Sequence, residues 1–114
     1  MDLTVWQKAH HLTILIYRLT GKFPVFEKYR LVAQICRAVS SIPADIAEGY
    51  GRSSKKEFVN FLNIARGSAK ETHYHLILAR DLGYITEVKY QLLSGQCEEV
   101  CRMISGLINT IRQS

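Results

Sequence analysis

The chain has 114 residues, of which 47% are hydrophobic and 22% are charged. This balance is that of a globular protein with one domain and one core, and it excludes a disordered tail or a membrane protein. No apolar run approaches the ~20 residues that a membrane-spanning helix needs. Fifteen Lys and Arg against ten Asp and Glu give a net charge of +5, a bias that attracts polyanions without specifying a contact.

The N-terminus and the cysteines both point to the cytoplasm. Asp2 stands where a signal peptide would carry positive charge, and no small-residue cleavage site follows an apolar core. Cys36, Cys97 and Cys101 are odd in number and contain no Cys-x-x-Cys pair. We therefore expect free thiols without a disulfide or a metal.

The first predicted helix covers about residues 5–22. Its apolar residues recur at intervals of four and three, the spacing of helices that pack nearly parallel to one another. Thr4, followed three residues later by Gln7, predicts a capping box at the start. The apolar line consists of Val5, Ala9, Leu12, Ile16, Leu19 and Phe23.

The second predicted helix covers about residues 27–49, and the charge of Glu27 suits its start. Apolar residues keep a helical spacing on both sides of Pro43, so we expect the proline inside the helix, where it should bend the axis. The helix is expected to end at residues 49–51, where two glycines can adopt the left-handed conformation of a helix terminus.

The third predicted helix covers about residues 55–82, and Ser54 with Glu57 predicts a capping box at its start. Small residues surround Gly67 in its middle. Because glycine costs about 1 kcal/mol of helix propensity, we expect another helix to approach closely there. The bent middle of the second helix is the proposed neighbour.

The fourth predicted helix covers about residues 87–112 and follows Thr86, a typical N-cap residue. It carries two adjacent apolar lines, and a helix this apolar lies either at the centre of its bundle or against a partner subunit. Since short connections make successive helices antiparallel neighbours, the predicted fold is all-α. It is a single antiparallel up-down four-helix bundle over residues 1–114.

Polar residues beside the apolar lines of the second and third helices predict a structural network of ion pairs. The alternative, in which Glu48 and Glu71 are catalytic or metal-binding carboxylates, lacks the Glu-x-x-His pairs that bundle metal sites need. No acid, base and nucleophile can be assembled, so we expect no enzymatic activity, metal or cofactor. The network residues are Arg37, Ser41, Asp45, Glu48, Arg66 and Glu71.

Basic residues surround the expected start of the third helix, where free backbone amides and the helix dipole favour an anion. A solvated basic turn is the alternative interpretation. This first group consists of Arg52, Lys55 and Lys56, beside Ser53 and Ser54. A second group near the other loop would extend the positive surface if the two loops align, and it consists of Lys22, Lys28 and Arg30.

Several motifs between residues 5 and 85 match one known family as a set. They include Val5–Ala9, Phe23-Pro24, Glu27, Tyr29, Gln34-Ile35, Arg37-Ala38, Ser41–Ala44, Ile46–Gly49, Arg52, Phe61-Leu62, Ile64-Ala65, Gly67-Ser68, Glu71 and Leu82–Ile85. With these motifs the chain resembles the 23S rRNA intervening-sequence proteins, some of which are encoded within insertions in bacterial 23S rRNA genes. The sequence departs from the family pattern at Cys36, where a second arginine is frequent, and at Asp45, where asparagine is usual.

The resemblance implies a bundle that assembles as a cyclic homopentamer. It also implies kinship to the accessory protein of diversity-generating retroelements, which binds nucleic acid and a reverse transcriptase through a basic pentameric surface. We therefore predict a non-enzymatic, self-associating bundle that presents basic residues to structured RNA or DNA. The alternative is a scaffold for another protein, such as a reverse transcriptase, with the charge serving steering and solubility.

Overall fold

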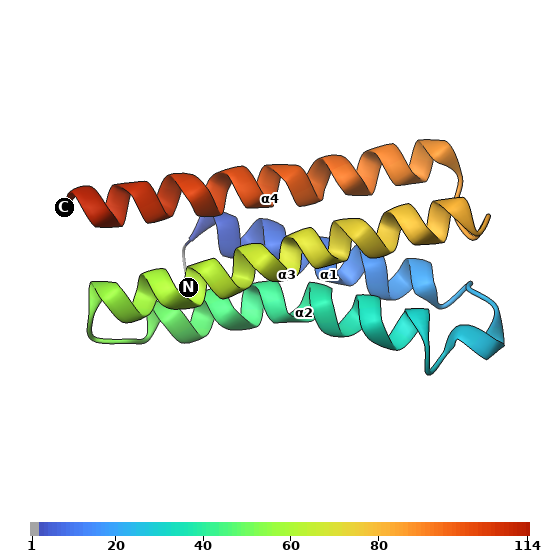
Figure 1. Ribbon diagram of the computed structural model, residues 1–114, viewed down its shortest axis with the longest axis horizontal. Coiled ribbons are helices and arrows are strands. Elements are labelled where there is room, and N and C mark those ends of the chain that lie inside the picture. Colours follow the sequence, from blue (N-terminus) through green and yellow to red (C-terminus); the bar gives the residue numbers. More distant parts are fainter. Residues whose placement is uncertain (1–2) are drawn as a thin grey trace.

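The computed structural model describes residues 3–114 and contains four α-helices and one short 3-10 helix, η1 (Figure 1). Asp2, which entered the prediction about the N-terminus, lies outside these residues. None of the described helices has the length and apolarity that crossing a membrane requires. The elements are α1 (Thr4–Thr20), η1 (Val25–Glu27), α2 (Leu31–Tyr50), α3 (Lys55–Asp81) and α4 (Glu87–Gln113).

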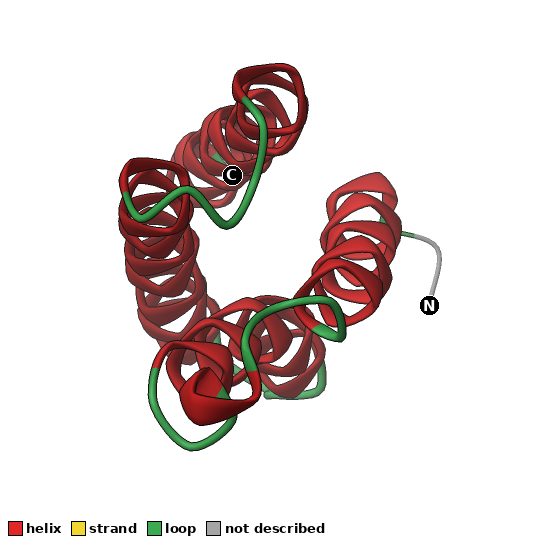
Figure 2. Cartoon of the chain, turned by 90° about the vertical axis from the view of Figure 1, so that its right-hand side faces the viewer, coloured by secondary structure: helices red, strands yellow, loops and turns green. Residues whose placement is uncertain are grey.

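The four helices lie along one direction and form a rod of 46 × 24 × 20 Å. In Figure 1 the colours run from left to right along α1 and α3 and from right to left along α2 and α4. The backbones of α1 and α2, α2 and α3, α3 and α4, and α4 and α1 approach one another, whereas the diagonal pairs within residues 3–114 do not. The prediction of an all-α four-helix fold is confirmed. Seen from one end, α1 and α4 are the most widely separated neighbours (Figure 2).

The core is built from aliphatic side chains of all four helices. The predicted line of α1 is buried at Val5, Ala9, Leu12 and Ile16. On α4, by contrast, one apolar line is buried and the other begins with exposed residues, Val88 at 81% and Leu92 at 54% exposure. The largest fully buried side chains include Leu12, Ile16, Ile35, Ile42, Ile46, Leu62, Leu76, Leu93, Ile104 and Ile108.

A close approach between α2 and α3 occurs at Gly49. A Cβ atom at this position would lie 2.7 Å from the Cβ of Phe61, closer than real Cβ atoms approach, and 3.0 Å from the Cδ1 of Phe58, which is a tight contact. At Gly67, which is exposed, an added Cβ would meet nothing within 4 Å. In the small-residue segment where a close approach is predicted, residues 65–69, Ala65 and Ala69 are fully buried, whereas Gly67 faces solvent. The glycine itself is therefore not a point of close approach.

Two of the predicted helix caps are present. The amide of Glu57 donates to the Ser54 hydroxyl and the amide of Lys89 donates to the Thr86 hydroxyl, each at 3.1 Å. Each contact satisfies one of the amides that the first turn of a helix leaves without a partner.

Two other predicted helix ends are wrong. Thr4 is the first residue of α1 and not its cap, which is Leu3 without a side-chain hydrogen bond. Gly51, at the end of α2, has a φ of −78°, so the predicted left-handed ending does not occur there. A positive φ occurs, within residues 3–114, at Gly83 after α3, where it is 81°.

The second helix starts later than predicted, at Leu31 rather than near Glu27. The chain before it closes hydrogen bonds between residues three apart, as from the amide of Lys28 to the carbonyl of Val25 at 3.0 Å. Glu27 still serves the start of α2, since its carboxylate accepts from the amide of Leu31 at 3.3 Å. Pro43 lies inside α2 as predicted, while a bend of the axis there stays a prediction.

Candidate nucleic-acid interface

The two predicted basic groups lie at opposite ends of the rod. Residues 51–54 connect α2 to α3 at the left end of Figure 1, and residues 21–30 connect α1 to α2 at the right end. The rod is 46 Å long, so the two groups form separate positive regions in one protomer.

The first group is partly engaged in contacts within the protein. Arg52 pairs with Glu48, and its guanidinium carbon lies 5.1 Å from the centre of the Phe61 ring. Lys55 donates from Nζ to the backbone oxygen of Ser114 at 2.7 Å. Lys56 makes no such contact within the described residues. It lines a hollow together with Lys55, Val59, Asn60, Ile111, Arg112 and Ser114.

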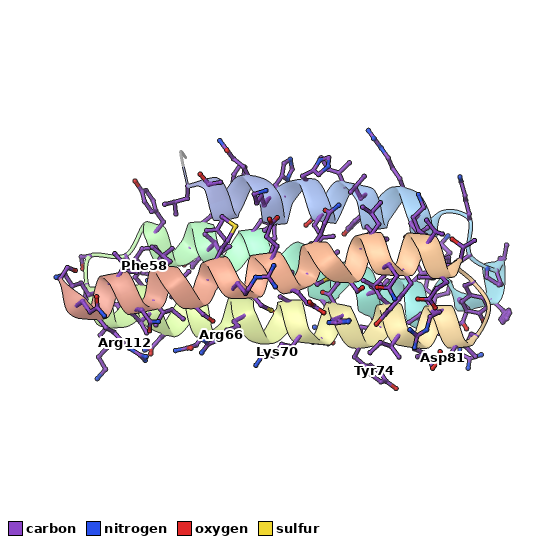
Figure 3. The ribbon with its side chains drawn as sticks, turned by 90° about the horizontal axis from the view of Figure 1, so that it is seen from above. Phe58, Arg66, Lys70, Tyr74, Asp81 and Arg112 are labelled. Atoms are coloured by element: carbon purple, nitrogen blue, oxygen red, sulfur yellow. The ribbon has the colours of Figure 1, made fainter. Side chains whose placement is uncertain are left out.

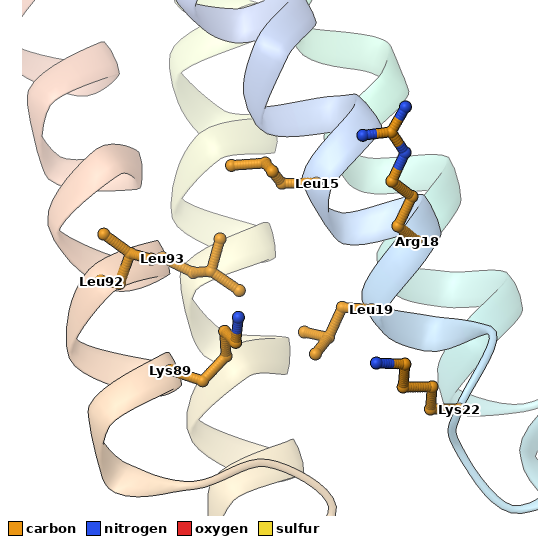
Figure 4. A pocket seen from close by; sticks show the side chains of 7 residues that line it. All are labelled: Leu15, Arg18, Leu19, Lys22, Lys89, Leu92 and Leu93. Carbon is orange, nitrogen blue, oxygen red and sulfur yellow. The ribbon is translucent and has the colours of Figure 1, made fainter.

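The second group is freer. Lys22 and Lys28 have no carboxylate partner in residues 3–114, and the Nε of Arg30 lies 3.7 Å from Glu27 Oε1. Lys22 also borders a hollow between α1 and α4, close to two further cations, Arg18 and Lys89 (Figure 4). Four leucines line the same hollow: Leu15, Leu19, Leu92 and Leu93.

Sequence reasoning missed Arg18 and Lys89, although a signal for each was present. Arg18 precedes Lys22 by four residues, so both lie on one side of the end of α1. Lys89 lies in the first turn of α4, which an up-down bundle places at the same end as residues 21–30. The predicted topology was therefore sufficient to add both cations to the second group.

A buried carboxylate holds the turn that carries the second group. Glu27 is 5% exposed, and Oε2 accepts a 2.7 Å hydrogen bond from the hydroxyl of Tyr84. This hydrogen bond lowers the pKa of Glu27, and it raises the pKa of Tyr84. The connection after α3 is thereby tied to the connection before α2.

The predicted polar network consists of separate contacts. Arg37 of α2 pairs with Glu71 of α3, and the hydroxyl of Ser41 donates to the carbonyl oxygen of Arg37 at 2.8 Å. Glu48 pairs with Arg52, one turn further along the chain. Arg66 instead reaches α4, where it donates to the Ser105 hydroxyl at 2.9 Å.

Burial raises the pKa of Asp45, and the nearby charge of Glu48 adds to this effect. Burial also opposes the charge of Glu71, but hydrogen bonds from Arg37 and His75 outweigh it and lower the pKa of Glu71. His75 lies 3.3 Å from Glu71 through Nε2. Of these groups, Arg37 of α2 and Glu71 of α3 carry opposite charges, and their pairing stabilises the contact between the two helices.

Cys97 and Cys101 offer no activated nucleophile. Burial raises the pKa of Cys97 to about 12, and burial also raises the pKa of Cys101. Since the thiolate is the reactive form, both side chains remain thiols at neutral pH. Cys36, Cys97 and Cys101 are all free.

The fold and the candidate site together define a small all-α bundle with positively charged ends. The chain matches the family model described as "23S rRNA-intervening sequence protein" over residues 1–106, and it belongs to this family. It is also similar to the crystal structure of a protein of unknown function from the S23 ribosomal protein family of Bacteroides thetaiotaomicron. That structure is 30% identical in sequence, with a TM-score of 0.86 over 92% of this chain and 95% of the other. No curated protein matches the chain significantly.

Proposed function

We propose that the protein is a non-enzymatic, self-associating bundle in the bacterial cytoplasm whose basic ends bind structured RNA or DNA. The observation that carries this proposal is that most carboxylates form ion pairs within the protein, whereas many cations do not. Of the carboxylate side chains in residues 3–114, Asp45 and Glu57 alone lack a cation partner. The cations without a carboxylate partner gather mainly at the two ends: Arg18, Lys22, Lys28 and Lys89 at one, and Lys55, Lys56 and Arg112 at the other.

Self-association is supported by the apolar residues that a single protomer leaves exposed. Val88 and Leu92 of α4 face solvent, and contiguous apolar surface of this kind is typical of an interface. The number five comes from the resemblance to pentameric proteins. Five copies of one basic end would turn weak individual phosphate contacts into tight binding by raising the effective concentration.

The test is nucleic-acid binding measured across a salt series. We expect the affinity for a structured RNA to fall steeply with salt, because each phosphate contact releases counterions. The double charge reversal Lys22→Glu with Lys28→Glu should weaken binding roughly tenfold or more and reduce the salt dependence. Reversal of Lys55 and Lys56 measures the contribution of the other end.

Lys70→Glu is the matched control, since Lys70 is exposed on α3 between the two ends of the rod (Figure 3). Binding that is insensitive to salt, or an equal loss in the control, would contradict phosphate contacts at the ends.

The second candidate function is a scaffold or accessory subunit for another protein, such as a reverse transcriptase. The hollow between α1 and α4 favours it, because four leucines lie there beside three cations. This pattern suits a partner helix with apolar and acidic side chains. A pull-down from nuclease-treated extract separates the two functions, since a partner captured through nucleic acid is lost and a directly bound protein is kept.

A further inference from the structure

Residues 25–30 form a tight turn whose sides differ in character. Its hydrogen bonds join residues three apart, including Arg30 N to Glu27 O at 3.0 Å, and at this spacing side chains three apart lie above one another. Glu27 is turned inward onto Tyr84. Phe26 and Tyr29 occupy one of the outward sides, and both are exposed.

The two rings on this side have no aromatic partner. Phe26 is 59% exposed and Tyr29 is 83% exposed. Other rings pack on each other, such as Phe23 on Tyr84 at 5.3 Å between centres, but Phe26 and Tyr29 contact no other ring within residues 3–114. Since exposed aromatic surface is costly in water, these rings are available to stack on a ligand.

A positive charge lies beside one of these rings, and a second lies in the same connection between α1 and α2. The Nζ of Lys28 lies 5.4 Å from the centre of the Tyr29 ring, and Lys22 follows directly on the end of α1. The carboxylate of Glu27 is buried and held by Tyr84, so it faces inward rather than toward these lysines.

We infer that this turn binds unpaired nucleotides of an RNA or DNA strand, with bases stacked on Phe26 and Tyr29 and phosphates neutralised by Lys22 and Lys28. Aromatic platforms beside a positive track are the general means by which proteins bind single strands. A duplex keeps its bases stacked on each other and offers mainly phosphates, so it would leave the rings unused. The inference rests on the proposed function and specifies its ligand as the unpaired part of a structured nucleic acid.

A second copy of the chain fits this surface less well. Its carboxylates are almost all paired with its own cations, so it offers little negative charge to Lys22 and Lys28. Two copies meeting at this turn would bring like charges together.

The experiment uses fluorescein-labelled oligo(U) and oligo(dT) of about twelve nucleotides, a length within the usual range for single-strand sites. Anisotropy titrations should show binding of both strands, and comparison of the two separates RNA from DNA as the preferred source of unpaired bases. An unlabelled duplex of equal length should compete poorly. Tyr29→Ala and Phe26→Ala should each weaken binding roughly tenfold.

The salt dependence distinguishes stacking from charge. Tyr29→Ala should lower the affinity without changing its slope against salt, whereas Lys28→Gln should reduce the slope by about one phosphate contact. Tyr29→Trp retains a stacking surface and should preserve binding, whereas Tyr29→Leu, which is apolar but not aromatic, should not. Tyr74→Ala is the matched control, since Tyr74 is similarly exposed, at 57%, on α3 away from the turn (Figure 3).

Several results would overturn the inference. One is a duplex that competes as well as the single strand, and another is unchanged binding in Tyr29→Ala and Phe26→Ala. A fall in the mass of the assembly in Tyr29→Ala, with nucleotide affinity unchanged, would make the turn an interface between copies. If binding is salt-dependent but indifferent to the rings, the proposed function stands and this inference fails. If no nucleic acid binds even at low salt, both fail.

Discussion

Gly49 of α2 lies at a close contact with α3 that leaves no room for a side chain. Gly49→Ala would place a Cβ 2.7 Å from the Cβ of Phe61, and we expect it to lower the free energy of unfolding by about 1–3 kcal/mol through overpacking. Gly67→Ala is the matched control, because its added Cβ meets nothing within 4 Å. It should raise stability by up to about 1 kcal/mol through helix propensity.

Denaturant unfolding of both variants checks this prediction. If both substitutions change the free energy of unfolding equally, then α2 and α3 accommodate the added Cβ at Gly49 without destabilising the fold.

The hydrogen bond from Tyr84 to Glu27 makes stability depend on pH. Because it lowers the pKa of Glu27, its contribution is complete above the pKa of the unfolded chain and is lost as the pH falls through the lowered value. Tyr84→Phe should therefore be less stable than the unmodified protein near neutrality, and the difference should shrink toward acidic pH. Thermal unfolding between about pH 3 and pH 7 measures this.

Tyr74→Phe removes an exposed hydroxyl that makes no such bond and serves as the control. A pH-independent difference in Tyr84→Phe would contradict the assigned role of the Glu27 carboxylate.

At the scale of single elements, the sequence was sufficient where the signal is local. Ser54 and Thr86 cap the helices that follow them, because a cap needs only the residues of the first turn. The start of α2 was misplaced because the turn before it depends on Glu27 and Tyr84, which are far apart in the chain. Helical spacing correctly predicts that Ala65 and Ala69 are buried, but the cost of a glycine in a helix does not by itself show that Gly67 contacts a neighbour.

The fourth helix carries the prediction about assembly. Val88 and Leu92 are exposed on α4, so Val88→Gln with Leu92→Gln should reduce self-association while leaving the fold intact. Light scattering at micromolar concentration should give a mass several times 13.0 kDa for the unmodified protein and a lower mass for the double variant. Ile64→Gln is the control, because it changes a comparably exposed residue, at 55%, on α3, and it should leave the mass unchanged.

A single species of 13.0 kDa for the unmodified protein would remove self-association from the proposed function. Circular dichroism of each variant shows that any change of mass is not loss of helix.

At the scale of the whole molecule, the grouping of the basic residues follows from the up-down topology, which the sequence predicts. Lys22 precedes α2 and Lys56 follows it, so the length of this helix places the two lysines at opposite ends of the rod. The same topology brings Lys89 to Lys22 across the hollow between α1 and α4. The sequence does not show which carboxylates form ion pairs within the protein, because pairs such as Arg37 with Glu71 join different helices.

Both ends of the rod carry unpaired cations, so both ends have a net positive charge. Copies standing side by side in a ring would repel one another at both rims, whichever way each copy points. Dissolved ions screen that repulsion, so rising ionic strength would tighten the ring even as it loosens the grip on a nucleic acid. Assembly would thus strengthen with salt, whereas nucleic-acid binding would weaken. A bound nucleic acid would neutralise the positive rims and so stabilise the ring in the way that salt does.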